Sequence, residues 1–192
     1  MVKKVILGAL LGGLAYFIWG AVAHMATPLG STGFSTMPVD KEPAALAAMK
    51  AAAPRAGLYH FPGFDHGKAL SESERRAWEA KLKEGPMGML IITPEGGEAM
   101  TPGQLVTQLG ISVLVALLAS VLLAVTRLSY AGRVGLVVLL GLFAFVSIHL
   151  RYWNWYRFPT DFTVAAGLEE VLGGLVLGLV LAAIVKPKPA AG

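Results

Sequence analysis

Four long apolar blocks, separated by more polar segments, organise this chain. They cover about residues 5–25, 104–126, 134–150 and 162–185. A helix rises 1.5 Å per residue, so about 20 apolar residues cross the roughly 30 Å hydrocarbon core of a bilayer. The pattern therefore predicts a membrane all-α fold, a four-helix transmembrane bundle. The third block is at the short end for a span.

The segment 26–103, between the first two blocks, is too polar to span a membrane but carries signals for short elements. Asp40 is placed to cap one helix, and Ser71 with Glu74 forms an S-x-x-E capping box for a second. Two apolar runs, 58–61 and 87–92, can pair as a small sheet. We predict a small α+β cap between helices 1 and 2.

The first block has a second interpretation as a secretory signal peptide. Lys3 and Lys4 would form its basic start, and 21–23 (Ala-Val-Ala) fits a cleavage site flanked by small residues. We favour an uncleaved anchor, because the block is longer than a usual signal core and carries Tyr16 and Trp19. Cleavage would leave three spans instead of four.

Composition agrees with a membrane protein and removes several chemistries. The chain is 55% hydrophobic and only 15% charged, whereas a soluble domain is about 25% charged. It has no cysteine, which excludes disulfides and thiolate chemistry. Its net charge of +4 is not gathered into a basic patch with interleaved aromatics, so we predict no nucleic-acid partner.

Basic residues flank the apolar blocks and set a predicted orientation. On one side of the predicted membrane they are Lys3, Lys4, Arg127, Arg133, Lys186 and Lys188, with no acid among them. Cytoplasmic loops carry such an excess of Lys and Arg. We therefore predict a multi-pass protein of the cell inner membrane with both termini cytoplasmic and residues 26–103 extracytoplasmic.

Glu169 and Glu170 lie inside the fourth block, where an acid is costly. An ionised side chain at the centre of a span costs roughly 2.5–3.5 kcal/mol on insertion scales, so such residues usually face a partner or water. Glu170 shares an i, i+4 stripe with Gly174 and Gly178, a small-residue packing motif. The pair is either a proton, cation or ligand site or a buried contact that fixes helix register.

The first block carries a matching stripe, again with members four residues apart: Gly8, Gly12, Tyr16, Gly20 and His24. If the two glycine faces pack against each other in antiparallel helices, the Tyr16 hydroxyl lies near the depth of Glu170. We predict a hydrogen bond between these two side chains, with His24 above them at the outer interface.

The outer ends of the spans also collect His149, Arg151 and Asp161. Imidazole and carboxylate groups could hold a metal, but no ligand spacing on one helix face supports such a site, and His60 and His66 are equally unremarkable. We predict no metal and no cofactor. In the simpler interpretation, Arg151 and Asp161 pair across their loop.

The segment that follows the third block is rich in aromatic residues, Trp153 and Trp155 among them. Aromatic residues at a span boundary are typical of the belt at the membrane interface. They could also wall a pocket for a lipid or a quinone-like ligand.

Three motifs carry a resemblance to a known group of proteins. They are Trp19-Gly20-x-x-x-His24, Phe61-Pro62-Gly63 and the run WNWYRFPTDF at 153–162. Together they resemble a set of small bacterial four-span inner-membrane proteins that have no known activity. The resemblance implies a bacterial four-span unit and implies nothing about mechanism.

Two functions remain open from the sequence. The first is a structural or accessory subunit, or an oligomer that packs through glycine-rich helix faces, with the lipid bilayer, other membrane subunits or a second copy as partners. The alternative is a small-molecule, lipid or ion- or proton-binding membrane protein, such as a transporter component, centred on Glu169 and Glu170. No catalytic constellation points to an enzyme.

Overall fold

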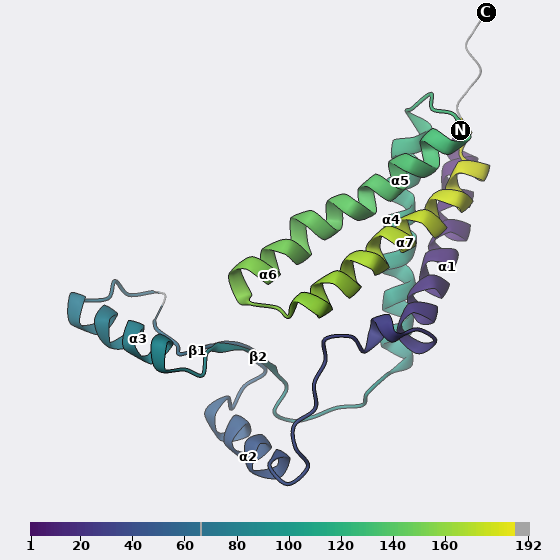
Figure 1. Cartoon of the computed structure of the whole chain (residues 1–192). Helices are drawn as coiled ribbons and strands as arrows, with labels where there is room; N and C mark the ends of the chain where they lie inside the picture. The colour runs from purple at the N-terminus through teal and green to yellow at the C-terminus, as the bar shows by residue number, and fades with distance from the viewer. Residues whose placement is uncertain (66, 187–192) are drawn as a thin grey trace, which may run out of the picture. The chain divides into compact units, whose positions relative to one another are not determined.

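The computed structural model describes residues 1–65 and 67–186 and divides them into two compact units (Figure 1). One unit combines residues 1–34 with the chain from residue 100 onward, and the other covers 35–99. The chain is mostly helical, at 68%, with one small two-stranded sheet. The residues of each unit contact mainly one another.

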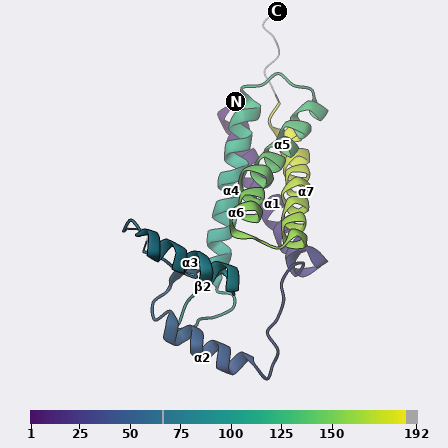
Figure 2. The ribbon, with the colours of Figure 1, turned by 60° about the vertical axis from the view of Figure 1, so that its left-hand side comes forward.

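The first unit contains the long helices (Figures 1 and 2). Its elements are α1 (Val2–Met25), a short 3-10 turn η1 (Pro28–Gly30), α4 (Pro102–Ala124), α5 (Tyr130–Ala144), a π-helical turn η2 (Phe145–His149), α6 (Leu150–Tyr156) and α7 (Thr160–Ile184). Within the described residues, four helical stretches are long and apolar enough to cross a membrane: α1, α4, the continuous run Tyr130–Tyr156, and α7. The prediction of four long apolar helices is confirmed.

Side-chain capping at Thr101 sets the start of α4. Thr101 is the N-cap, its hydroxyl accepts from the backbone N–H of Gln104, and the Gln104 side chain accepts from the Thr101 N–H. Pro102 occupies the first helical turn, where its missing N–H has no partner to lose. Local chemistry therefore sets this helix boundary.

The long helices form an open arrangement rather than a closed bundle. α1 packs against both α4 and α7, and α7 packs against α5 along most of its length, whereas α4 and α5 make at most marginal contact. The shared core is aliphatic and gathers where α7 meets its neighbours, with Leu123, Val137, Leu177, Leu181 and Val185 fully or nearly buried. The side between α4 and α5 is left open.

Small residues let α1 approach both of its neighbours. A Cβ added at Gly12 would lie 2.6 Å from the Leu181 side chain of α7, and one at Gly13 would lie 2.6 Å from the Val113 backbone of α4. On α4, the small residues Ser112 and Ala116 are buried. Close approach of backbones through small residues is the usual packing mode of membrane helices.

The predicted contact between the two glycine stripes is wrong. Gly174 and Gly178 of α7 pack against the backbone of Val137 and Val134 in α5, not against α1. An added Cβ at Gly20 would meet nothing within 4 Å. Residues four apart advance about 40° around a helix of 3.6 residues per turn, so a stripe that faces a neighbour at Gly8 has rotated away from it at Gly20.

The predicted loop from Arg151 to Asp161 is wrong over its first part, because residues 151–156 are helical. Helix continues through η2 and α6 to Tyr156, and Arg157 ends it in the left-handed conformation at φ 58°. Residues 142–158 contain no proline and no glycine that could end the helix earlier. Apolar sequence stops at Leu150, but a helix needs only backbone hydrogen bonds to continue, so Tyr152–Tyr156 are helical.

In the second unit, α2 (Glu42–Ala52), β1 (Gly57–Phe61), α3 (Glu72–Glu84) and β2 (Gly88–Ile92) follow in order. The two strands pair antiparallel, with Leu58 opposite Ile91, as the apolar runs predict. Asp40 is not the cap of α2, because the N-cap residue is Lys41 and no side chain caps it. Among the described residues of this unit, Ala53 is the one buried apolar residue, so its core is minimal.

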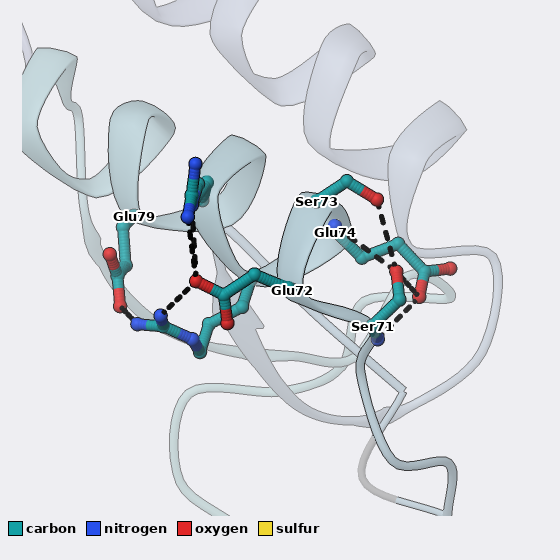
Figure 3. Close-up of polar contacts among 7 residues, drawn as sticks. Ser71, Glu72, Ser73, Glu74 and Glu79 are labelled. Carbon is teal, nitrogen blue, oxygen red and sulfur yellow. Dashed lines mark hydrogen bonds and ion pairs between the residues drawn. The ribbon is translucent and has the colours of Figure 1, made fainter.

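The capping box that begins α3 is present (Figure 3). The Ser71 hydroxyl accepts from the Glu74 N–H at 3.3 Å, and the Glu74 carboxylate accepts from the Ser71 N–H at 2.8 Å. The side-chain hydrogen bond from Ser71, followed by the backbone one, lowers the pKa of Glu74. Arg75 bridges Glu72 and Glu79 along the next turns. This helix is specified by its own sequence.

Arg133 has a structural role in addition to its charge. Its side chain is only 6% exposed and donates from Nη1 to the Leu128 carbonyl at 2.7 Å and from Nη2 to the Ala182 carbonyl at 2.8 Å. Ala182 belongs to the last turn of α7, whose carbonyls have no partner inside the helix. The guanidinium therefore joins the end of α7 to the start of α5.

We expect Arg133→Ala to lower the free energy of unfolding by about 2–3 kcal/mol, because two carbonyls lose charge-assisted hydrogen bonds. Denaturation of the protein in detergent micelles measures this change. The matched control is Arg127→Ala, because Arg127 is exposed in the loop between α4 and α5. This substitution should change stability by less than about 0.5 kcal/mol. Equal stability of the two variants would contradict the capping role.

Candidate functional site

Two adjacent glutamates of α7 each meet a histidine from another helix. Glu169 Oε1 lies 3.4 Å from His24 Nδ1 near the end of α1, and Glu170 Oε1 lies 3.8 Å from His149 Nε2 at the end of η2. Both carboxylates are half-buried, with 29% and 30% of their side chains exposed. Each of the two acids of α7 therefore faces an imidazole group from another helical element.

The predicted hydrogen bond between Tyr16 and Glu170 is confirmed. The Tyr16 hydroxyl donates to Glu170 Oε2 at 3.3 Å, while Oε1 of the same carboxyl faces His149. The two oxygens of one carboxyl group thus face residues from two different helical elements. Of these two contacts, only the one with Tyr16 is within hydrogen-bond distance.

Trp19 ties the same helix turn to α1. Its Nε1 donates to the backbone carbonyl of Glu169 at 3.1 Å. Gly173, one turn further along α7, makes room for both aromatic rings of α1, since an added Cβ would lie 2.6 Å from the Tyr16 ring and 3.0 Å from the Trp19 ring. The glycine is the reason that Tyr16 reaches the Glu170 carboxyl and Trp19 reaches the Glu169 backbone carbonyl.

The π-helical turn explains how His149 reaches α7. A turn with i→i+5 bonds holds one extra residue, so the residues after it are rotated by about 100° relative to an uninterrupted α-helix. The Phe145 ring, at the start of this turn, packs over Gly167 of α7 and stacks on the His149 ring, with centroids 6.3 Å apart. Single π-turns are frequent at functional sites.

The carboxylates border two cavities. One, of about 570 Å³, lies between α4 and α5 over α1 and α7, and the other, of about 460 Å³, lies between α1 and α4. Glu170, Tyr16 and Gln108 line both cavities, while Glu169 and His24 line the smaller one. Glu170 is therefore accessible from both.

The titratable groups that line the two cavities are mainly acidic. Neither cavity is lined by a lysine or an arginine from the described part of the chain, and the charged or titratable groups are the two carboxyls, His24 and the Tyr16 phenol. Gln108 adds an amide from α4. The sequence prediction missed Gln108, although an amide inside the apolar block 104–126 was a signal that could have found it.

Four other candidate residues do not reach this site. Arg151 is exposed on α6, and Asp161 accepts from the Phe162 N–H at 2.8 Å. The predicted pair between Arg151 and Asp161 is not among the ion pairs that the described residues form, because helix α6 replaces the expected loop. Trp153 donates to the Thr160 hydroxyl at 3.1 Å, and Trp155 is 76% exposed.

Neither Trp153 nor Trp155 lines the two cavities. Their exposure is typical of an aromatic belt at an interface rather than of a pocket wall. Phe158 instead stacks on Tyr152, with ring centroids 5.4 Å apart, and contacts Phe162 at 5.5 Å. These rings close the short connection between α6 and α7.

No group of three or more His, Asp or Glu side chains that could hold a metal ion is formed by residues 1–65 and 67–186. The imidazole and carboxylate groups of the site come together in pairs only. His66, one of the two histidines considered in the segment 26–103, lies outside the described residues.

Comparison of the chain with models of protein families, with curated proteins and with solved structures gave no match. The resemblance to small bacterial four-span proteins therefore stays a prediction. The function has to be argued from the geometry of the site.

We expect Gly173→Ala to displace the Tyr16 and Trp19 rings, because the new methyl group would overlap both. The displacement should weaken the hydrogen bond to Glu170, shift tryptophan emission and cost about 1–3 kcal/mol of stability. Fluorescence and thermal unfolding in detergent measure both effects. Gly20→Ala is the matched control, since its methyl meets nothing within 4 Å; identical spectra and melting for the two variants would contradict the role of Gly173.

Proposed function

We propose that this chain is a multi-pass protein of a bacterial inner membrane that binds a small ligand at Glu170. Membrane insertion is supported by one face of α1, where Ile6, Leu10, Leu14 and Ile18 are 46–54% exposed. Monomeric soluble proteins rarely expose apolar patches of this kind. Lipid is the natural neighbour of such a face.

We propose that both termini are cytoplasmic and that the segment 26–103 is extracytoplasmic. The support is the distribution of basic residues near the ends of the helices, where Lys3, Lys4, Arg127 and Lys186 are exposed. Arg133 is buried and caps α7, so it contributes less to this argument than the sequence suggests. Lys188 lies outside the described residues.

We also propose that α1 remains attached as a membrane anchor. Cleavage after Ala23 would remove Tyr16 and Trp19, which contact Glu170 and the carbonyl of Glu169. It would also remove Gly8 and Gly12, which pack against α7. A helix with this many specific contacts is an integral part of the unit.

The single observation that carries the binding function is the position of Glu170. Its carboxyl is held by Tyr16 and faces His149, yet it lines both cavities. A carboxyl that served only to fix helix register would be enclosed by its partners. Ligand sites are typically apolar cavities of about 300–1,000 Å³ with a few convergent polar groups, and the larger cavity fits this description.

Oligomerisation through the glycine faces has less support than it had from the sequence. Gly8, Gly12, Gly174 and Gly178 pack against other helices of the same chain. An accessory role remains a second candidate on a different observation, because α4 and α5 leave the unit open on the side where they fail to meet. A helix of another membrane subunit could occupy that side.

Chemically, the site offers acceptors for a proton, a cation or a hydrogen-bond donor. A bound cation would compete with the Tyr16 hydroxyl and the neighbouring imidazole groups for the carboxyl oxygens.

We expect a hydrophobic carbodiimide, which reacts with protonated carboxyl groups, to modify Glu170 in lipid nanodiscs. Modification should increase when the pH is lowered from about 8 to about 6, because lower pH favours the protonated carboxyl, which is the form that reacts with the reagent. Peptide mass spectrometry locates the product. Glu170→Gln should lose the modification and keep the melting temperature within a few degrees.

The control for reagent access is a water-soluble carbodiimide, which should label the exposed acids of 35–99 and spare Glu170. If the hydrophobic reagent leaves Glu170 unmodified at both pH values, the carboxyl is sealed and the binding function is wrong. That result would favour a purely structural pair.

The orientation can be tested with reporter fusions that are active only outside the cytoplasm. A fusion within 35–99 should be active, and one after Lys186 inactive. Reversing the charges of Lys3, Lys4 and Arg127 together should disturb this pattern, because these residues are the exposed basic flanks. Arg133 is left unchanged, since its replacement would remove the α7 cap. An unaltered pattern would count against the charge argument.

A further inference from the structure

The larger cavity is a lateral groove, here defined as the space between α4 and α5 above α7. Its walls are Ile111, Val115 and Leu118 from α4 and Leu140 from α5, and its floor includes Gly174 and Leu177 of α7. Because α4 and α5 do not pack against each other along this space, the groove is a gap in the helix arrangement and not a defect inside a packed core.

The walls suit a saturated chain better than a planar ring. Apart from Tyr16, no aromatic side chain lines the groove, and its other apolar lining residues are aliphatic or small. From Ile111 to Leu122 the lining residues of α4 cover about 16 Å at 1.5 Å per residue, close to the roughly 15 Å of one leaflet of the hydrocarbon core. One extended aliphatic chain matches this length.

The polar groups of the groove gather at one end. Gln108 precedes the apolar lining residues of α4, and Glu170 precedes Gly174 and Leu177 on α7, while Tyr16 donates to the Glu170 carboxyl. The groove is therefore amphipathic along its length, with hydrogen-bonding groups next to the smaller cavity and hydrocarbon beyond.

The charge at this end selects the head group. The carboxyl of Glu170 is the one acid in the lining of the groove, Glu169 lines the adjoining cavity, and no lysine or arginine among the described residues lines either. An anionic head would lie against carboxylates. A primary ammonium group has three donors, and it would find acceptors in Glu170, the Gln108 amide oxygen and the Tyr16 hydroxyl oxygen.

We propose that the lateral groove binds a single-chain aliphatic amphiphile with a primary ammonium head, its chain between α4 and α5 and its head at Glu170, Gln108 and Tyr16. This inference rests on the proposed binding function and names its ligand class. A two-chain phospholipid fits less well, because its phosphate would face Glu170.

Dodecylamine is the probe, with dodecanol and dodecanoic acid as equal-length neutral and anionic comparisons. The protein is reconstituted in phosphatidylcholine nanodiscs, and radiolabelled ligand bound above that of empty nanodiscs is measured. We expect saturable binding of one dodecylamine per chain, about tenfold or more tighter than either comparison, as expected for one charge-assisted hydrogen bond. Equal binding of the three compounds would overturn the proposal.

Two variants locate the chain and the head. Val115→Phe fills the groove and should weaken dodecylamine binding about tenfold, whereas Leu114→Phe, on the exposed neighbouring position of α4 that does not line the groove, should leave it unchanged. Glu170→Gln should remove the preference for the amine over the alcohol and keep binding of the alcohol. Equal effects of the two phenylalanine variants would exclude the groove.

Failure of this inference can be distinguished from failure of the proposed function. If Glu170 reacts with the hydrophobic carbodiimide but dodecylamine shows no preference over dodecanol, the binding function stands and the ligand class is wrong. If Glu170 does not react and the amine does not bind, both proposals are wrong.

Discussion

An ionised carboxyl group is stable within a hydrocarbon-like environment only when opposite charge, hydrogen-bond donors or water accompany it. Two consecutive glutamates in α7 impose this requirement twice on one helix turn, and their side chains leave the helix about 100° apart. Partners must therefore come from two directions. Glu169 meets His24 of α1, and Glu170 meets Tyr16 of α1 and His149 at the end of η2. The need to satisfy these two acids places α1 and the π-turn against the same segment of α7.

Close approach on both sides of α7 requires small residues, and α7 supplies them on separate faces. Gly173 receives the rings of Tyr16 and Trp19, while Gly174 and Gly178 receive the backbone of α5. Because α4 packs mainly against α1 and α5 packs mainly against α7, α4 and α5 are held by different helices and do not close the arrangement. The same packing that satisfies the carboxylates thus leaves the lateral groove, and the groove ends at Glu170.

The partners of the carboxylates do not enclose them. About 30% of each side chain remains exposed, and the Glu170 group faces one cavity with mainly aliphatic walls and a second cavity whose largely apolar lining also includes Glu169 and His24. A structural ion pair is most stable when all of its hydrogen-bonding capacity is used, since desolvation otherwise outweighs the attraction. Unused acceptor capacity at an amphipathic groove is a property of ligand sites, and it gives the proposed binding function its physical basis.

The sequence by itself determined the features that depend on neighbouring residues: the four apolar helices, the capping box at Ser71, the pairing of the two short strands and the costly position of the two acids. It also predicted the contact of Tyr16 with Glu170, although the two glycine stripes from which that contact was argued do not pack against each other. Only the tertiary structure decided which helix each glycine faces, that a π-turn carries the third helix past Arg151 to Tyr156, that Gln108 joins the site, and that Arg133 caps α7. The physical reason is that the direction in which a side chain leaves its helix changes along the helix. Each helix turns about 40° for every four residues, and the extra residue of a π-turn adds about 100°, so contacts between distant helices depend on rotations that no local pattern records.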